Sequence, residues 1–302
     1  MSPPLSALSD DLDFQRDGRS RRLRMARRQG RGGEGARMLL LHGNPGTMDD
    51  LGGLAERLAP RHDWLALDLP GFGRSPSPPG GAAGLRIEAQ ADDVAAALEA
   101  LSWTEPMFVL GHSHGGGLAH LLAARHPRLV RGIVAIASLG YPAHGSYRFL
   151  GMPGMEALAR ALSVGFRGRG LAPMMRLLVQ ANMRSIFSPE LVTGAVARKE
   201  AEALASRPEI LLNMVRLAQG RPCEAVLGAA RRVRQPCLYL HGRLERLVPS
   251  RHVLALHQAR ERAGLPSRFE LLEGGHMLPR YQAASLAERI EAWVEPLAKA
   301  EA

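Results

Sequence analysis

Cysteine is scarce in this sequence, which has only Cys223 and Cys237 among its 302 residues. Two cysteines are too few for a disulfide scaffold, and their spacing matches no metal motif, so we expect a reducing compartment, the cytoplasm. Long apolar runs are also missing, because none approaches the roughly 20 residues that a membrane-spanning helix needs. These absences predict a soluble chain without a membrane span.

Lysine is almost absent and occurs only at Lys199 and Lys299, so the net charge of +10 comes from arginine. Aromatic residues make up only 5% of the chain. No aromatic platform or recognisable nucleic-acid-binding motif accompanies the arginines. With the abundance of Ala, Gly and Pro, the arginine excess is typical of compositional bias, and we expect no nucleic-acid partner.

The first residues lack the apolar core of a secretory signal. Residues 1–18 are rich in Pro, Ser and Asp, and we expect a flexible, partly disordered lead-in there. In residues 19–28, arginines alternate with Leu23 and Met25. This pattern predicts an exposed edge strand that its charges protect from pairing with other chains.

Strands and helices alternate over the next hundred residues. Short apolar runs of the kind buried on both faces of a parallel sheet lie at 36–42, 64–68, 107–110 and 132–138. Helical spacing lies between them at 47–59, 86–101 and 118–126. In the second of these helices we expect Asp92 and Asp93 on the solvent side. The alternation predicts an α/β protein with a doubly wound, mostly parallel sheet flanked by helices.

The alternation stops near residue 140 and resumes after residue 221. Residues 140–221 show only helical segments interrupted by prolines, so we expect a helical lid inserted after the sixth strand. Its methionines could form an adaptable apolar substrate pocket or could pack the lid's own core: Met152, Met155, Met174, Met175, Met183 and Met214. Further strands are predicted at 236–241 and 268–272, and further helices at 223–234, 250–263 and 281–298. The predicted core therefore comprises residues 19–139 and 222–302.

The segment Gly111-His112-Ser113-His114-Gly115 links a predicted strand to a predicted helix. A Gly-x-Ser-x-Gly turn in this context holds its serine in a strained conformation above the sheet edge, which makes Ser113 the candidate nucleophile. The alternative is a helix-capping serine in a nucleotide-type turn. The glycines that follow have no partner lysine or acidic ribose ligand, so we expect no phosphate, dinucleotide or metal cofactor.

Five motifs occur in an order that resembles the α/β-hydrolase superfamily, in particular its lidded serine hydrolases of the esterase and lipase type. They are His42-Gly43-Asn44-Pro45-Gly46, Asp68-Leu69-Pro70-Gly71-Phe72-Gly73-Arg74-Ser75, Gly111 to Gly116, His241 to Pro249, and Gly274-Gly275-His276. The resemblance covers residues 20–298. It implies an α/β-hydrolase fold, with His276 as the general base that takes the proton of Ser113.

The family most often places an aspartate after the penultimate strand, but this sequence has Glu245 at the matching position. Every aspartate lies at or before Asp93, so the family order of serine, acid, histidine leaves only glutamate. We therefore expect Glu245 to orient His276. The alternative is that Glu245 is a surface residue paired with Arg243 or Arg246.

The oxyanion hole is expected from two backbone N–H groups. One belongs to His114, next after the nucleophile, and by elimination and resemblance the other belongs to Asn44, since Pro45 has no N–H. Asp68 matches a family position that supports loop structure.

These residues predict a serine hydrolase that cleaves an ester or similar acyl bond of a small apolar substrate through an acyl-enzyme. The same triad could instead serve C–C bond hydrolysis, acyl transfer or amide cleavage. A third possibility is a catalytically weak ligand-binding protein on the same scaffold. The natural substrate and the oligomeric state are not encoded in these motifs.

Overall fold

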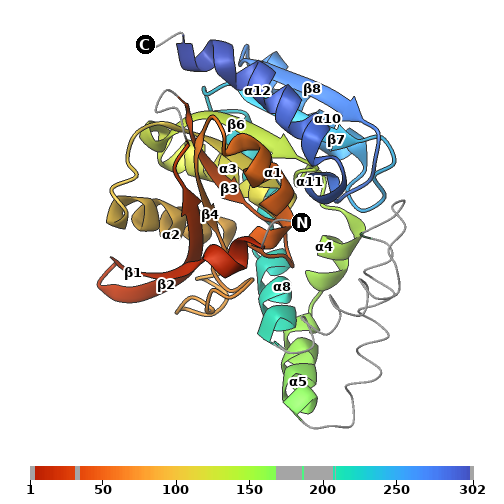
Figure 1. The fold of residues 1–302 in the computed structure, drawn as a ribbon. Helices are drawn as coiled ribbons and strands as arrows, with labels where there is room; N and C mark the ends of the chain where they lie inside the picture. The colour runs from red at the N-terminus through yellow and green to blue at the C-terminus, as the bar shows by residue number, and fades with distance from the viewer. Residues whose placement is uncertain (1–3, 31–34, 168–185, 187–206, 208, 300–302) are drawn as a thin grey trace.

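The computed structural model describes residues 4–30, 35–167, 186, 207 and 209–299. They form one eight-stranded sheet in the order β1-β2-β4-β3-β5-β6-β7-β8 (Figure 1). The strands are β1 Asp10–Arg16, β2 Arg19–Arg28, β3 Arg37–Leu41, β4 Asp63–Leu67, β5 Met107–His112, β6 Val130–Ile136, β7 Cys237–Gly242 and β8 Ser267–Leu272. All pairings from β4 to β8 are parallel, and β1 and β2 are antiparallel. The predicted α/β class with a mostly parallel sheet is confirmed.

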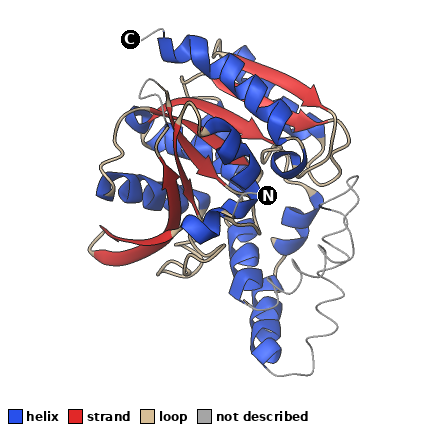
Figure 2. Ribbon diagram, in the orientation of Figure 1, coloured by secondary structure: helices blue, strands red, loops and turns tan. Residues whose placement is uncertain are grey.

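Helices cover both faces of the sheet (Figure 2). Successive residues of a strand face opposite sides, so that on β3 Met38 and Leu40 belong to one core, while Leu39 and Leu41 belong to the other. The first core includes η1 Leu5–Leu8, η2 Met48–Leu51, α1 Gly52–Leu58, α11 Leu278–Tyr281 and α12 Ala283–Lys299. The second includes α2 Ile87–Ala100, α3 His114–Arg125, η3 Pro127–Leu129, α9 Pro222–Ala230 and α10 Ser250–Arg262.

The N-terminal segment differs from the expectation of a partly disordered lead-in over residues 1–18. Residues 10–16 form β1, which pairs along its full length with β2. Phe14 and Leu23 are buried by this hairpin, and the ladder satisfies backbone groups that a disordered segment would leave to water. The edge-strand prediction for residues 19–28 is also wrong, because β2 lies between β1 and β4 and β1 is the edge.

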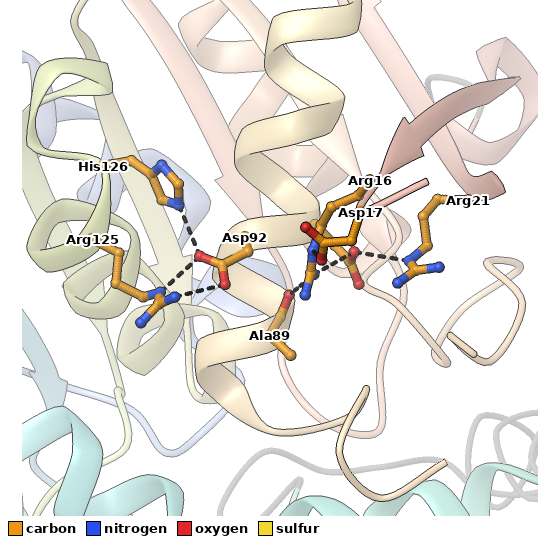
Figure 3. A network of polar contacts seen from close by, with 8 residues as sticks. Arg16, Asp17, Arg21, Ala89, Asp92, Arg125 and His126 are labelled. Carbon is orange, nitrogen blue, oxygen red and sulfur yellow. Dashed lines mark hydrogen bonds and ion pairs between the residues drawn. The ribbon is translucent and has the colours of Figure 1, made fainter. Parts of the chain in front are cut away.

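The hairpin also changes the surroundings of α2. Asp93, expected on the solvent side, is 1% exposed and binds Arg16 Nη1 at 2.6 Å and Arg21 Nε at 3.1 Å. Figure 3 shows Arg16 and Arg21 on the side of α2 that faces the hairpin. Burial raises the pKa of Asp93 against the opposing effect of these two guanidinium groups. Asp92, by contrast, is partly exposed and accepts two hydrogen bonds from Arg125 at the other side of the helix. The hairpin that contains β1 therefore buries a face of α2 that the sequence pattern predicted to be exposed to solvent.

The segment between β6 and β7 contains α4 Gly145–Leu150, α5 Met155–Arg167 and α8 Glu209–Gln219 before α9. Figure 1 shows α5 and α8 projecting away from the α/β layers. Asn213 on α8 is buried and attaches the helix to the core, since its Nδ2 donates to Gly71 O at 2.9 Å and to Ser77 Oγ at 2.8 Å. Glu156 on α5 accepts a hydrogen bond from Arg216 of α8 at 3.0 Å.

The methionines of this insertion differ in how far they are buried. Met152 is 52% exposed, and Met214 packs partly buried against the core. Met174, Met175 and Met183 lie outside the described residues.

A buried arginine on α10 binds the backbone at the end of α9 and just before β7 and β8. Arg260 on α10 is fully buried, and its guanidinium donates four hydrogen bonds to backbone carbonyls at 2.7–3.2 Å. The acceptors are Ala230, Val233, Gln235 and Pro266. They lie at the end of α9 and immediately before β7 and β8, so this one side chain satisfies the backbone at the start of both strands.

We predict that Arg260→Met destabilises the protein by about 3 kcal/mol, because buried carbonyls lose a charged donor that an apolar side chain cannot replace. The measurement is the free energy of unfolding from urea titration. The matched control is Arg262→Met, an exposed position on the same helix, which should change the free energy by less than about 0.5 kcal/mol. Equal effects of the two substitutions would contradict the role given to Arg260.

Candidate active site

Ser113 stands at the junction of β5 and α3 with φ 52° and ψ −114°. This left-handed conformation is strained for a residue with a side chain, and it is held because the flanking backbone is packed too closely to relax. A Cβ on Gly111 would collide with the carbonyl of Gly115, and one on Gly115 would collide with the carbonyl of Leu41 on β3. The tight turn predicted from Gly-x-Ser-x-Gly is therefore present, and Ser113 lies where α3 begins, at the helix end that favours negative charge.

His276 and Glu245 are in direct contact. Nδ1 of His276 lies 2.6 Å from Oε2 of Glu245, and both side chains are at least 95% buried. The other carboxylate oxygen accepts hydrogen bonds from the N–H groups of Leu247 and Val248 at 2.6 and 3.1 Å. Because a carboxylate only accepts, this contact places a proton on Nδ1 and leaves Nε2 as the lone-pair nitrogen of the neutral ring.

The ionisation of Glu245 follows from these contacts. Burial alone would raise its pKa, but the adjacent His276, with a further contribution from His241 and the Val248 N–H, outweighs burial and lowers the pKa to about 2. The carboxylate is therefore charged at neutral pH. The alternative of an exposed ion pair with Arg243 does not describe this geometry, since Arg243 binds Glu273 at 2.9 Å instead.

The loop that carries His276 packs against the turn that carries Ser113. Nε2 of His112 donates to the backbone oxygen of His276 at 2.9 Å, and the two imidazole rings lie 4.9 Å apart. Within the described part of the chain, no hydrogen bond joins Ser113 Oγ to His276. Such bonds are often long before substrate binds. The structure thus places the imidazole beside the residue that precedes the serine, with its Nε2 not engaged by Glu245.

The loop after β3 approaches the same turn. A Cβ on Gly43 would lie 3.1 Å from Cβ of Ser113, so Asn44 follows directly on a residue that touches the serine. As the first residue of α3, His114 has no intrahelical acceptor for its N–H, and the described residues supply no acceptor for the N–H of Asn44. Both N–H groups expected to bind an oxyanion are therefore available at this loop and turn.

Most of the other histidines at this edge of the sheet bond within the fold. His42 accepts from the N–H of Leu69 at 2.9 Å and donates to Gly43 O at 2.7 Å, which fixes the loop before Asn44. The ring of His114 bonds to Gln90 Oε1 at 2.8 Å. His241, at the end of β7, bonds to Val248 O at 3.0 Å and so supports the loop of Glu245.

Two contacts near the site could not be predicted from the sequence. Tyr147 on α4 accepts a hydrogen bond from Asn44 Nδ2 at 3.3 Å. Arg280, four residues after His276, binds Asp50 at 2.7 Å and joins the loop of the candidate base to the segment after Asn44. Each pair is separated by more than a hundred residues, so neither periodicity nor a local motif could have indicated it.

Ionisation keeps the two cysteines out of this chemistry. Burial raises the pKa of the thiols of Cys223 and Cys237 to about 12. Both are free of disulfides, and at neutral pH neither supplies a thiolate.

Comparison with known families gives a match over residues 36–279 to the model described as alpha/beta hydrolase fold. This chain belongs to the α/β-hydrolase fold family. The matched range includes the loop of Asn44, the turn of Ser113, the insertion after β6, and the loops of Glu245 and His276, so the resemblance expected from the five motifs is confirmed for the fold.

Solved structures similar to this α/β-hydrolase share its fold over nearly the whole chain. An esterase from Thermogutta terrifontis is 21% identical with a TM-score of 0.69, covering 96% of this chain and 98% of its own. A putative epoxide hydrolase from Pseudomonas aeruginosa is 20% identical with a TM-score of 0.73, covering 99% of both chains.

Among curated proteins, the magnesium-chelatase 30 kDa subunit of Rhodobacter capsulatus is 29% identical over 271 residues, which cover 87% of this chain and 88% of the relative. Other curated relatives are longer than the region they share with this α/β-hydrolase, which spans 8% of one and 30% of another. In the described part of the chain, no helix combines the length and the apolar character needed to cross a bilayer.

Five buried histidines make stability sensitive to acid. Burial lowers the pKa of His114 to about 3 and the pKa values of four others to about 4, namely His112, His120, His144 and His241. In the unfolded chain these groups titrate near 6.5. Between about pH 6.5 and pH 4 the unfolded state therefore binds more protons than the folded state, so the free energy of unfolding falls as the pH is lowered through this window.

We predict that the urea midpoint is highest above about pH 6.5 and decreases steeply towards pH 4, measured at constant ionic strength. The matched variant is His120→Gln, which removes one of the five groups at a position facing Tyr239 rather than the candidate base. Its pH slope should be smaller by up to about 1.4 kcal/mol per pH unit. A midpoint that does not change between pH 7.5 and pH 5 would contradict the burial of these rings in the neutral state.

Proposed function

We propose that this protein is a serine hydrolase that cleaves an ester, or a similar acyl bond, with Ser113 as nucleophile, His276 as general base and Glu245 as its orienting acid. The observation that carries the proposal is the 2.6 Å contact between His276 Nδ1 and Glu245 Oε2, beside a serine held at φ 52°. A buried carboxylate on Nδ1 fixes the tautomer in which Nε2 accepts a proton, which is the role a general base needs.

The proposed reaction proceeds through an acyl-enzyme. Ser113 Oγ attacks the carbonyl carbon while its proton passes to His276 Nε2, and the resulting oxyanion is stabilised by the N–H groups of Asn44 and His114. The bond to the leaving alcohol then breaks, and His276 returns the proton to the alcohol oxygen. Water, deprotonated by the same imidazole, attacks the acyl-enzyme carbonyl, and collapse of the second intermediate releases the acid and restores the Ser113 hydroxyl.

An apolar substrate is supported by the distribution of exposed apolar side chains. Several belong to segments that follow the carboxyl ends of the strands carrying the site: Tyr141, Phe149, Met152, Leu158, Leu244 and Tyr281. We propose that the insertion after β6 acts as the lid over this edge of the sheet. Such a surface favours a small apolar ester over a charged substrate. The same triad geometry would also serve acyl transfer, amide cleavage or C–C bond hydrolysis, which the choice of substrate separates.

Ser113→Ala should abolish labelling by a fluorophosphonate probe and turnover of p-nitrophenyl butanoate, because the alcohol that forms the acyl-enzyme is removed. The measurements are the mass of the labelled protein and the release of p-nitrophenol. Ser250→Ala, an exposed serine at the start of α10, is the control and should behave like the natural protein. Labelling that persists in Ser113→Ala would assign the nucleophile elsewhere.

Glu245→Gln should lower kcat by about 10³- to 10⁴-fold without unfolding the protein, because the amide neither fixes the tautomer nor stabilises the imidazolium. Glu273→Gln is a matched control, since Glu273 follows β8 at the same sheet edge, is exposed and binds only Arg243 among the described residues. The rates of ester hydrolysis are compared with the melting temperatures of both variants. A Glu245→Gln enzyme with near-normal kcat would show that another carboxylate orients His276.

A second candidate function is ligand binding with a slow or idle triad. It is favoured by the likeness over 87% of the chain to a relative whose name describes a subunit of a larger enzyme, magnesium chelatase. The fluorophosphonate experiment separates the two candidates. If the intact protein is neither labelled nor active on short p-nitrophenyl esters, binding replaces hydrolysis as the better proposal.

A further inference from the structure

Asn44 and Tyr147 form a polar pair directly beside the candidate oxyanion hole. Nδ2 of Asn44 donates to the hydroxyl of Tyr147 at 3.3 Å. Asn44 follows Gly43, which touches Ser113, while Tyr147 lies on α4, the first helix after β6. The pair therefore joins the loop after β3 to the insertion, at the end of the sheet that carries the serine.

The pair has hydrogen-bonding capacity that the described residues do not use. Oδ1 of Asn44 is buried and has no partner. The hydroxyl of Tyr147 accepts from Asn44, and no acceptor for its own proton occurs among the described contacts. Burial raises the pKa of Tyr147, so the hydroxyl keeps that proton at neutral pH. One acceptor and one donor are thus left side by side.

The ring of Tyr147 is held in place by its neighbours. His144 packs edge-on against it with ring centroids 4.7 Å apart and an interplanar angle of 84°, and both side chains are buried. His144 also lies close enough to His276 and Glu245 for their charges to influence its pKa. The hydroxyl of Tyr147 is therefore fixed in a position on the candidate site's side of α4, which is the condition for a specific polar contact.

A buried carbonyl-type oxygen without a hydrogen-bond partner destabilises the fold, and a bound group with a matching donor would remove that cost. A hydroxyl is the group that fits, since it can accept the proton of Tyr147 and donate its own to Asn44 Oδ1. A carboxylate or a carbonyl would satisfy Tyr147 but would set one oxygen acceptor against another at Asn44. An alkyl group would satisfy neither residue.

We propose that Asn44 and Tyr147 form a subsite that binds a hydroxyl group of the substrate within a few bonds of the scissile carbonyl. The inference rests on the proposed ester hydrolysis and narrows its substrate class to hydroxylated, otherwise apolar esters. Tyr147 acts here as a residue that determines specificity, and its contact with substrate is separate from the oxyanion contacts of the Asn44 and His114 backbones.

The test compares esters with and without a hydroxyl on either side of the carbonyl. Phenyl butanoate is compared with phenyl 2-hydroxybutanoate and phenyl 3-hydroxybutanoate, and ethyl butanoate with 2-hydroxyethyl butanoate, by titrating the acid released. We expect kcat/KM of the natural protein to favour at least one hydroxylated ester by tenfold or more. In Tyr147→Phe this preference, taken as the ratio of kcat/KM for the hydroxylated ester to that for the matched plain ester, should fall about tenfold.

Tyr141→Phe is the matched control, because Tyr141 lies in the same β6–α4 connection but is exposed, and it should keep the preference. A ratio of two substrates within one variant cancels any partial loss of folded protein, and comparing this ratio between variants cancels the intrinsic reactivity of each ester. If esters are hydrolysed but no hydroxylated ester is preferred, or the preference survives in Tyr147→Phe, the subsite is wrong and the proposed hydrolysis stands. If no ester is hydrolysed and the fluorophosphonate probe does not label Ser113, both proposals fail.

Discussion

The close approach of three backbone segments around Ser113 is the constraint on which the rest of the site depends. Gly111, Gly115 and the end of β3 leave no room for side chains, and this crowding holds the serine in a left-handed conformation. The cost of such a conformation, on the order of 1–3 kcal/mol, has to be offset by the surrounding packing. The two buried cores above and below the sheet supply that packing, because β3, β5 and β6 lie at its centre.

The loops that carry Glu245 and His276 are held by a different kind of interaction. Glu245 uses one oxygen for the backbone of its own loop and the other for His276, so the same carboxylate shapes the β7 loop and fixes the ring on the β8 loop. A glutamate has one more methylene than the aspartate common at this position, and here the bonds to Leu247 and Val248 fix the longer side chain. The buried charge is tolerated because each described hydrogen-bond partner of the carboxylate is a donor.

Much of this arrangement could be predicted from the sequence because its signals are local. The Gly-x-Ser-x-Gly turn, the short apolar strands and the Gly-Gly-His loop each carry their information within a few residues. Glu245 followed from a count of aspartates together with the resemblance, and the structure places it on His276. The strands from β3 to β8 could likewise be predicted, since strands buried on both faces appear in the sequence as continuous apolar runs.

The parts that the sequence did not reveal depend on contacts between distant residues. The Asp-rich start of the chain has the composition of a disordered segment, but Asp93 on α2 and the arginines of the hairpin neutralise one another only after folding. The position of β2 inside the sheet was missed for the same reason. The sequence of β1 is too polar to predict a strand unless its pairing with β2 is known. Similarly, nothing near Tyr147 in the sequence points to Asn44, which lies 103 residues earlier.

Two of the contacts that connect the insertion after β6 to the core differ in chemical character. The side-chain N–H groups of Asn213 on α8 donate to a backbone and a side-chain acceptor of the 71–77 loop, which makes this contact a structural attachment. The contact of Asn44 with Tyr147 on α4 leaves a buried oxygen and a hydroxyl proton without partners among the residues that the structure describes. Buried polar groups that serve stability alone are normally satisfied within the fold. The difference between the two attachments therefore favours a role for α4 in contacting a bound molecule, and a role for α8 in holding the insertion in place.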